Sequence, residues 1–375
     1  MTVPTGRPLD PNVDAALEAL GSGRALPSAW YTDADLFARE QDRVLRRSWH
    51  YVGHSEQLAE PGDQLVCQVA GAPLVLVRRP DGDVAGFLNI CRHRAHQVVL
   101  ADQRRNSLQC HYHGWTYGLD GSLLNAPRCD REPGFDPSPL GLLPVQVAVW
   151  GATVWANVDP TAPSFEEWIG GLPELVASHG VDVDVHRLAF EKEWRIRANW
   201  KVFLDNAIEC YHCPTCHPEL SRVLEMDPAL QEHVIGGRYW TTHTMQLRPV
   251  PLGSPPGTPV PDGPPQMYHF HWIFPTTYFQ YARLGFDIGS IDVLGVDEIR
   301  FRSVTFVPRD TSEADVEALQ ERYRVDPTVD QDVAICERVQ AAHATGLAPP
   351  GQLLPHTEEL LLHYQRVDVE MVAAP

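Results

Sequence analysis

Residues 199–220 read NWKVFLDNAIECYHCPTCHPEL, and most of the chemistry expected of the chain converges on this stretch. Nothing between Trp200 and His212 interrupts a helix, which we expect to stop at Pro214. At helical spacing, one face of this helix carries Asp205, Ile208, Glu209 and His212. A second imidazole, His217, follows one turn later. Two converging histidines beside carboxylates suit a divalent metal that keeps positions open for other ligands.

Two other interpretations of this stretch remain open. The histidines can be surface groups, or core groups satisfied by hydrogen bonds, on an ordinary helix. The three interleaved cysteines suggest a zinc site instead, formed by Cys210, Cys213 and Cys216. Their overlapping C-x-x-C spacings lack a second knuckle elsewhere in the chain, which disfavours zinc.

Composition limits the class of protein. A chain of 375 residues can bury a large core and suggests two domains. The formal net charge of -19 argues against nucleic acid as a partner. We expect a cytoplasmic protein without a signal peptide, because the N-terminus lacks an apolar run. We also expect no membrane span, because the most apolar stretch, 142–158, is interrupted by Pro144 and Gly151. The eight cysteines are interpreted as thiols and ligands rather than as a disulfide framework.

The first half of the chain predicts helices followed by a small antiparallel module. A short helix is expected around residues 14–20, and Thr32 or Asp33 can cap a second that runs to about Arg47. The hydrophobic period then changes to two, and a turn at Pro80, Asp81 and Gly82 joins two of the strands. The expected strands are 64–69, 74–79, 84–89, 145–149 and 153–157.

Within this module lies the most specific pattern of the sequence. Cys91 and His93 stand in one loop, and Cys110 and His113 stand in a second loop further along. A two-iron cluster with two cysteines on one iron and two histidines on the other requires this division of ligands. A tetrahedral zinc ion is the alternative, although the C-x-H and C-x-x-H spacings differ from those of zinc fingers and no recognition helix follows.

With both loops and the 199–220 stretch in view, the chain resembles the oxygenase (alpha) subunits of the Rieske non-haem iron oxygenases. The resemblance covers the chain from about Thr32 onward, in that family's order of domains. It implies an α+β protein with an antiparallel Rieske [2Fe-2S] domain and a helix-grip catalytic domain. We therefore expect an N-terminal helical segment (1–46) that packs on the catalytic domain, a Rieske domain (47–158) and a mononuclear iron domain (159–375).

The resemblance also implies roles for individual residues. Cys91 and Cys110 would hold one iron of the cluster, and His93 and His113 the other. His212 and His217 match the two histidine ligands of a mononuclear Fe(2+). Glu209 matches the acid that links this iron to the Rieske histidine, here His113, of a neighbouring subunit in a homotrimer. Asp205 falls where several relatives have Asn near the iron.

The resemblance places the third iron ligand far downstream, on a C-terminal helix, where Asp330 and Asp332 are the candidates. On the helix expected at about 327–344, Asp332 lies on the apolar stripe, whereas Asp330 lies on the polar face. The stripe comprises Val329, Asp332, Val333, Cys336 and Val339. A buried carboxylate is energetically costly unless it is paired with a cation or bound to a metal, so we select Asp332 as the third iron ligand. The alternative is that Asp332 is a buried acid paired with an arginine.

Between His217 and this helix, alternation predicts an antiparallel sheet that packs on helices. The strands are expected at 238–247, 267–275, 278–284 and 298–307. The proline-rich stretch 249–265 is expected to be a loop, either a lid over the site or a plain surface excursion. Strand aromatics could form a cage for a quaternary ammonium group or serve as ordinary core: Trp240, Tyr268, Phe270, Tyr278 and Tyr281.

These observations predict an enzyme that activates dioxygen with electrons from a separate reductase or ferredoxin, because no nicotinamide or flavin motif is visible. Glu209 and the chain length resemble the homotrimeric carnitine and glycine-betaine branch, which favours monooxygenation with N- or O-dealkylation over dihydroxylation of an aromatic ring. The rivals from other classes are an electron carrier without turnover and a zinc hydrolase. An acidic donor is expected to dock on six arginines near the cluster loops, with solvated charge as the alternative: Arg92, Arg94, Arg104, Arg105, Arg128 and Arg131.

Overall fold

The computed structural model describes residues 11–250, 254, 265–282 and 285–374, which belong to two compact units. The discontinuous unit contains the residues up to Val44, Phe190–Thr305 and Thr311–Pro375, and the inserted unit contains Leu45–Ala189 with Phe306–Asp310. The predicted domain boundaries at 46/47 and 158/159 stay predictions, because compactness alone does not delimit a functional domain. Among the described residues, no helix has the length and apolar character needed to cross a bilayer.

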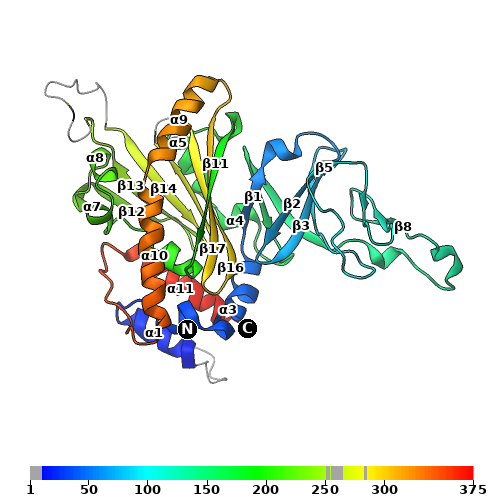
Figure 1. The fold of residues 1–375 in the computed structure, drawn as a ribbon, viewed down its shortest axis with the longest axis horizontal. Coiled ribbons are helices and arrows are strands. Elements are labelled where there is room, and N and C mark those ends of the chain that lie inside the picture. Colours follow the sequence, from blue (N-terminus) through cyan, green and yellow to red (C-terminus); the bar gives the residue numbers. More distant parts are fainter. Residues whose placement is uncertain (1–10, 251–253, 255–264, 283–284, 375) are drawn as a thin grey trace. The chain divides into compact units, whose positions relative to one another are not determined.

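The inserted unit is built on antiparallel sheets (Figure 1). A seven-stranded sheet has the order β1-β10-β9-β4-β3-β2-β5, and a three-stranded sheet has the order β6-β7-β8. The larger sheet contains β1 (His50–His54), β2 (Asp63–Val69), β3 (Ala72–Arg78), β4 (Val84–Leu88), β5 (Gln103–Arg104), β9 (Pro144–Trp150) and β10 (Thr153–Asn157). The smaller contains β6 (Leu108–Gln109), β7 (Thr116–Tyr117) and β8 (Leu123–Asn125).

The strands predicted for this unit are confirmed, each within two residues of its expected bounds. Strand β3 is apolar on both of its faces. Val75 and Val77 enter one hydrophobic cluster, whereas Leu74 and Leu76 enter another on the opposite side of the strand. The predicted β3–β4 hairpin is also present, and Gly82 takes the left-handed backbone conformation (φ +92°) that its turn requires.

A second seven-stranded sheet, of order β11-β17-β16-β15-β14-β13-β12, belongs to the discontinuous unit except at the start of β11 and the end of β17. The strands are β11 (His186–Ile196), β12 (Gln231–Ile235), β13 (Trp240–Gln246), β14 (Met267–Ile273), β15 (Thr277–Tyr281), β16 (Phe286–Gly295) and β17 (Glu298–Pro308). Four were predicted, whereas β11, β12 and β16 were not. The loop predicted at 249–265, with its suggested role as a lid, lies almost entirely outside the described residues.

Strand register assigns the aromatic side chains to two faces of this sheet. Tyr268 is opposite Met245 and Tyr278 is opposite Trp272, so these residues share one face with Phe270. We call it the inner face, because Met245 and Tyr268 pack there with Cys210 and Cys213. Two of the aromatic residues predicted for the cage lie on the other face. Trp240 is opposite Ile273 and Tyr281 is opposite His269, so neither Trp240 nor Tyr281 shares the inner face. Alternation along a strand does not show which of its two faces, that of the odd-numbered or that of the even-numbered residues, is the inner one.

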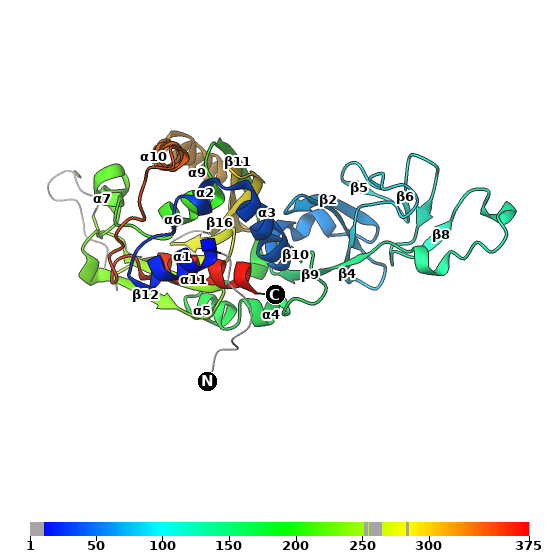
Figure 2. The same cartoon turned by 90° about the horizontal axis from the view of Figure 1, so that it is seen from below.

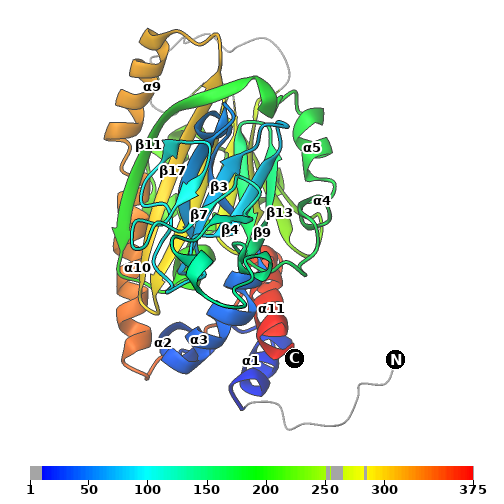
Figure 3. The same cartoon turned by 90° about the vertical axis from the view of Figure 1, so that its right-hand side faces the viewer.

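Helices from distant parts of the chain pack together in the discontinuous unit. α10 (Thr328–Ala344) lies against α6 (Trp200–Ala207) and α2 (Ala29–Thr32), as Figure 2 shows. α11 (Glu359–Ala373) lies against α1 (Pro11–Gly21) and α3 (Ala34–Arg43), as Figure 3 shows. Among the described residues, this unit also contains α7 (Cys213–Cys216), α8 (Leu220–Val223) and α9 (Glu313–Val325), whereas α4 (Phe165–Trp168) and α5 (Leu172–Ser178) belong to the inserted unit.

The helix predictions were correct in place but not in all their bounds, since α1 begins at Pro11 rather than at Asp14. Asp33 caps α3 as predicted, because its Oδ1 accepts the backbone N–H groups of Asp35 and Leu36. α3 nevertheless ends at Arg43, and a 3₁₀ turn covers Leu45–Arg47. The helices at 14–20 and 327–344 are present as α1 and α10, whereas α9 and α11 were missed. The predicted α+β class, with antiparallel sheets and packed helices, is confirmed.

An ion pair without solvent exposure ties three of these helices together. Lys201 of α6 donates to Glu40 of α3 at 2.5 Å, and the two side chains are 1% and 0% exposed. Asp368 of α11 is also buried, and its burial together with the Glu40 charge raises its pKa well above the usual value. Lys201 therefore compensates the buried charge of Glu40, since an unpaired buried charge is strongly unfavourable.

Replacing Lys201 by alanine is expected to lower the free energy of unfolding by about 3–5 kcal/mol, because it leaves two buried acids without their cation. Denaturant unfolding followed by circular dichroism measures the change. Arg197→Ala is the matched control, since Arg197 pairs with Glu337 in solvent and is 81% exposed. An equal loss of stability in both variants would contradict the assigned role of burial.

Candidate metal centres

The first candidate centre lies in the inserted unit, where two loops bring together the four residues predicted to hold a cluster. Cys91 and Cys110 are 3% and 1% exposed. Burial, with an added contribution from the Cys91 thiol, raises the pKa of Cys110. His93 and His113 are exposed, and their ring centroids are 4.6 Å apart. Two adjacent buried sulfurs and two adjacent exposed imidazoles fit a [2Fe-2S] cluster whose histidine-bound iron faces solvent.

Neighbouring residues hold these loops in place. Gly114 and Ala95 adopt left-handed conformations (φ +73° and +56°) that turn the two loops. Trp115 stacks on His93 with an interplanar angle of 6°. The hydroxyl of Tyr117 lies 3.3 Å from Cys91 Sγ and accepts the Arg92 N–H at 3.0 Å. Sequence reasoning missed Trp115 and Tyr117, because nothing in spacing alone shows that side chains after the second loop fold back onto the first.

Tyr117→Phe is expected to lower the midpoint potential of the cluster by about 40 mV. Burial raises the pKa of Tyr117, so its hydroxyl stays protonated and can donate to the cysteine sulfur. Such a bond favours the more negative, reduced state, and about 1 kcal/mol corresponds to about 40 mV for one electron. Redox titration of the visible spectrum measures the potential. Tyr112→Phe, whose side chain is exposed, is the control, and an unchanged potential in Tyr117→Phe would refute the assignment.

The second candidate centre lies in the discontinuous unit, and its first segment corrects the helix predicted for 200–212. α6 ends at Ala207, and the Ile208 N–H makes its last helical bond, to the Leu204 carbonyl. The carboxylate of Glu209 then accepts the Tyr211 N–H and hydrogen-bonds to His212 Nδ1 at 2.6 Å. These local side-chain bonds replace the next helical turn, so the predicted common face of residues 205, 208, 209 and 212 does not exist.

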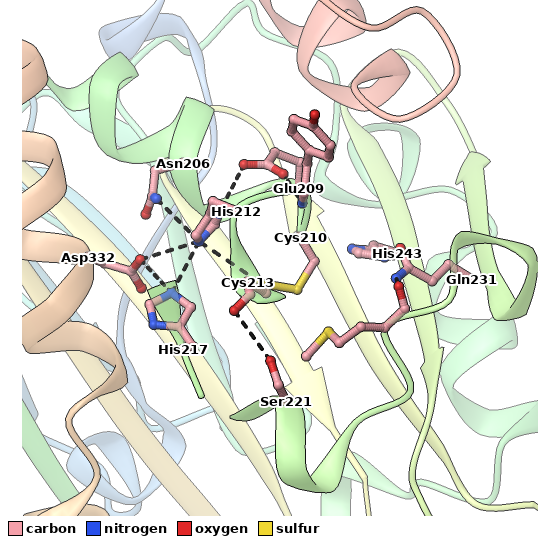
Figure 4. The surroundings of a disulfide bond; sticks show 12 residues. Asn206, Glu209, Cys210, His212, Cys213, His217, Ser221, Gln231, His243 and Asp332 are labelled. Atoms are coloured by element: carbon pink, nitrogen blue, oxygen red, sulfur yellow. Dashed lines mark hydrogen bonds and ion pairs between the residues drawn. A yellow bond between two sulfur atoms is a disulfide. The ribbon is translucent and has the colours of Figure 1, made fainter. Parts of the chain in front are cut away.

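Three predicted ligands nevertheless meet (Figure 4). The Nε2 atoms of His212 and His217 are 3.2 Å apart. Asp332 Oδ1 lies 3.0 Å from His217 Nε2 and 3.4 Å from His212 Nε2. An ion about 2.1 Å from three such atoms, at tetrahedral or octahedral angles, separates them by about 3.0–3.4 Å. The three side chains therefore fit one facial group of ligands for a divalent ion such as iron.

Hydrogen bonds fix the far sides of both imidazoles. Gln331 Oε1 lies 2.7 Å from His217 Nδ1. In the same way, Glu209 Oε1 lies 2.6 Å from His212 Nδ1. Each ring is thus oriented with Nε2 toward Asp332, an arrangement typical of metal-bound histidines. Burial alone would lower the pKa of His212, but hydrogen bonds with Asp332 and Glu209 outweigh it and raise this pKa to about 10. Sequence reasoning missed Gln331, although it directly precedes the selected aspartate.

The two aspartates of α10 differ as predicted. Asp332 is mostly buried, with 17% of its side chain exposed, and hydrogen bonds with the two histidines outweigh burial and lower its pKa. Asp330 is exposed and accepts a hydrogen bond from Trp194 Nε1 at 2.8 Å. One member of the predicted stripe was wrong, because Val339 is 39% exposed and Gln340 is buried in its place. Gln340 accepts the Asn199 N–H and donates to the Tyr31 carbonyl, which accounts for a polar residue there.

Asp205 is not brought to the two histidines. Its Oδ2 accepts hydrogen bonds from the Tyr31 hydroxyl at 2.7 Å and from Gln365 at 3.0 Å. Burial raises the pKa of Asp205 to about 6. The neighbouring Asn206, which sequence reasoning missed, lies 3.4 Å from His212 Nε2. Both residues belong to α6, where successive side chains point in different directions.

The cysteines of this segment give a second correction. Cys210 and Cys213 form a disulfide, with Cα atoms 5.0 Å apart, although all cysteines were expected to be thiols or ligands. The turn between α6 and α7 brings the two backbones within the range that a disulfide requires. The free cysteines of the described chain are Cys67, Cys91, Cys110, Cys129, Cys216 and Cys336.

Comparisons with known proteins agree with both centres. Residues 48–148 match the family described as "Rieske [2Fe-2S] domain", and residues 182–374 match "Ring hydroxylating alpha subunit (catalytic domain)". The carnitine monooxygenase oxygenase subunit of Escherichia coli (strain K12) is 33% identical over 253 residues, which span 67% of this chain and 66% of that protein. Chloroplastic choline monooxygenase of Amaranthus tricolor is 34% identical over 58% of this chain and 49% of its own length.

Solved structures share the fold. A quaternary ammonium Rieske monooxygenase superposes with a TM-score of 0.82 at 24% identity, over 95% of this chain and 98% of that one. Naphthalene 1,2-dioxygenase from Rhodococcus sp. superposes with a TM-score of 0.78 at 20% identity, over 96% and 97% of the two chains. Monooxygenases and a dioxygenase thus share this architecture, so the fold alone does not separate the two reactions.

Proposed function

Since this chain belongs to the ring-hydroxylating oxygenase alpha subunits that carry a Rieske [2Fe-2S] domain, we propose that it monooxygenates a small quaternary ammonium compound or related amine. The reaction consumes dioxygen and electrons from a separate NAD(P)H-dependent reductase or ferredoxin. The observation that carries the proposal is the meeting of His212, His217 and Asp332 within 3.4 Å of one another. Three protein ligands on one side leave the other positions of an iron ion free.

In this proposal, Cys91, Cys110, His93 and His113 hold the cluster, and the three-residue group holds the mononuclear iron. The cluster supplies one-electron transfer, and the iron supplies activation of dioxygen. The protein's own contribution is orientation. Glu209 and Gln331 fix the imidazole rings through Nδ1, and Asp332 holds its carboxylate between the two Nε2 atoms. We further assign Glu209 as the link to His113 of an adjoining subunit in a homotrimer.

The inner face supports a cationic substrate. Tyr268, Phe270 and Tyr278 share it, and Tyr278 covers Gly289, where any larger side chain would collide with its ring. The negative faces of aromatic rings attract quaternary ammonium groups, for which no hydrogen bond is possible. The named carnitine and choline enzymes are monooxygenases, which favours this reaction over cis-dihydroxylation of an aromatic ring.

A single turnover of the reduced protein under isotopically labelled dioxygen tests the function, with betaines, aryl ethers and simple aromatics as substrates. One labelled oxygen in the product, or an aldehyde with a dealkylated amine, is the expected result. Two labelled oxygens on adjacent ring carbons would instead identify a ring dioxygenase. An electron carrier without turnover would contain no iron beyond the cluster, and a zinc hydrolase would be colourless.

The arginines around the cluster loops predict a salt effect on electron delivery. Five of the six are exposed: Arg94, Arg104, Arg105, Arg128 and Arg131. Arg104 already pairs with Asp63, whereas Arg92 is half-buried and donates to the Gly141 carbonyl. Raising the ionic strength is expected to slow reduction of the cluster by the protein donor. The rate of reduction by dithionite should depend less on salt than the rate with the protein donor. Equal salt dependence for both reductants would contradict docking on these residues. Arg94→Gln, in stopped-flow assays, should raise the donor's KM.

A further inference from the structure

A disulfide brackets one of the proposed iron ligands. The Cys210–Cys213 bond spans a turn that contains His212 and begins directly after Glu209. Both cysteines are buried, at 8% and 4% exposure, and they pack with Leu224 and Met245. Figure 4 shows the bond beside the imidazole of His212. The state of this bond therefore bears on the surroundings of the metal site.

The sulfur of Cys213 lies close to the position of a ligand. It is 4.0 Å from His212 Nε2, and the candidate ligand atoms of His212, Cys213 and His217 all lie within 4.8 Å of one another. In a tetrahedral site with metal–sulfur and metal–nitrogen distances of about 2.3 and 2.1 Å, the sulfur and nitrogen are about 3.6 Å apart. The Cys213 sulfur therefore lies within about half an ångström of the separation from His212 Nε2 that shared coordination requires.

We propose that Cys213 is a redox-gated fourth ligand of the mononuclear site. The disulfide with Cys210 keeps its sulfur away from the metal, and reduction releases it to join His212, His217 and Asp332. The inference rests on the proposed function only in that these three residues hold a metal. A thiolate there would occupy a position needed by substrate or dioxygen, and it would shift metal preference from iron toward zinc.

The chemistry balances with simple reagents. A phosphine and one water reduce the disulfide to two thiols and a phosphine oxide, a two-electron transfer. The Cys213 thiol releases its proton to solvent when its sulfur binds the metal. Hydrogen peroxide reverses the change, forming the disulfide and two waters from the two thiols and one peroxide. Disulfides in reducing compartments are commonly transient or redox-sensing, as this assignment requires.

Cys216 provides an internal comparison. It belongs to the same segment, is half-buried and free, and its backbone N–H donates to the His212 carbonyl at 3.0 Å. Its sulfur is not part of the three-residue group that contains Cys213. Spacing alone makes the three cysteines equivalent, whereas the structure distinguishes Cys213.

Cobalt X-ray absorption tests the inference independently of activity. The full-length protein keeps its cluster, its mononuclear site is loaded with Co²⁺, and phosphine-treated and peroxide-treated samples are freed of reagent. We expect one Co–S distance of about 2.3 Å in the reduced wild type and its loss after peroxide. Cys213→Ser should lack the sulfur in both samples, Cys210→Ser should show it in both, and Cys216→Ser should behave as wild type. Intact mass after alkylation in denaturant verifies each thiol state.

The outcomes separate this inference from the proposed function. Cobalt bound without sulfur in the reduced wild type would overturn the gating and leave the three-residue metal site standing. A sulfur shell that persists in Cys213→Ser would also overturn the gating. Failure of cobalt to bind in any state would overturn the metal site itself, and the gating with it.

Discussion

Asp332→Ala is expected to abolish turnover while the visible spectrum of the cluster remains unchanged. The carboxylate supplies one of three ligand atoms, and its Oδ1 lies 3.0 and 3.4 Å from the two histidine nitrogens. Loss of groups that merely orient metal ligands costs about 10–100-fold in affinity or activity, so loss of a ligand should cost more than 100-fold. Iron analysis should find only the two iron atoms of the cluster.

Asp330→Ala is the matched control for that experiment. It lies on the same helix, two residues away, but its carboxylate is exposed and bonds to Trp194. We expect iron content and turnover close to those of the wild type. Retained turnover in Asp332→Ala, or equal losses in both variants, would refute the assignment of the third ligand.

Glu209→Gln is expected to have the second-largest effect. Glutamine keeps the size of the side chain and can still accept from His212 Nδ1, but it removes the negative charge that helps to raise the pKa of that histidine. Loss of a group that hydrogen-bonds to a metal ligand lowers metal affinity or activity by about 10–100-fold. If Glu209 also links the two centres, donor reduction of the cluster should proceed normally, whereas its reoxidation by substrate and dioxygen should slow by at least that factor.

Stopped-flow spectroscopy at the absorption of the cluster separates these two steps. Glu219→Gln is the control, since Glu219 is an exposed acid of the same segment. Slow reoxidation that is explained by depleted iron, and that returns to normal once iron is restored, would show that Glu209 only orients His212. Normal reoxidation with full iron content would remove Glu209 from the mechanism altogether.

Short-range patterns predicted much of this molecule, and they failed where contacts far apart in sequence decide. The strands around Leu74–Val77 were predictable because both parities are buried in hydrophobic clusters. The choice of Asp332 over Asp330 followed from helical period, once the resemblance had pointed to this helix. The early end of α6 depends on Glu209 bonding to its own neighbours, which competes with the helix but leaves no signal in composition.

Other features could not be predicted because their partners lie in distant segments. Asp205 is bound by Tyr31 and Gln365, from the two ends of the chain, so its proximity to His212 in sequence was misleading. The face of Trp240 is set by pairing with β14, and helix α11 carries buried polar residues that blur its period, among them Gln365 and Asp368. The Cys210–Cys213 pair depends on a turn geometry that residue spacing does not define.

The order of the units along the chain has a consequence for synthesis on the ribosome. The Leu45–Ala189 segment of the inserted unit emerges early, whereas its Phe306–Asp310 segment follows only after most of the other unit. α1 and α3 emerge before both segments, yet their partner is α11, the last helix. At about 5–20 residues per second they wait roughly 15–60 seconds for it. A premature stop before Glu359 therefore removes the helix against which α1 and α3 pack.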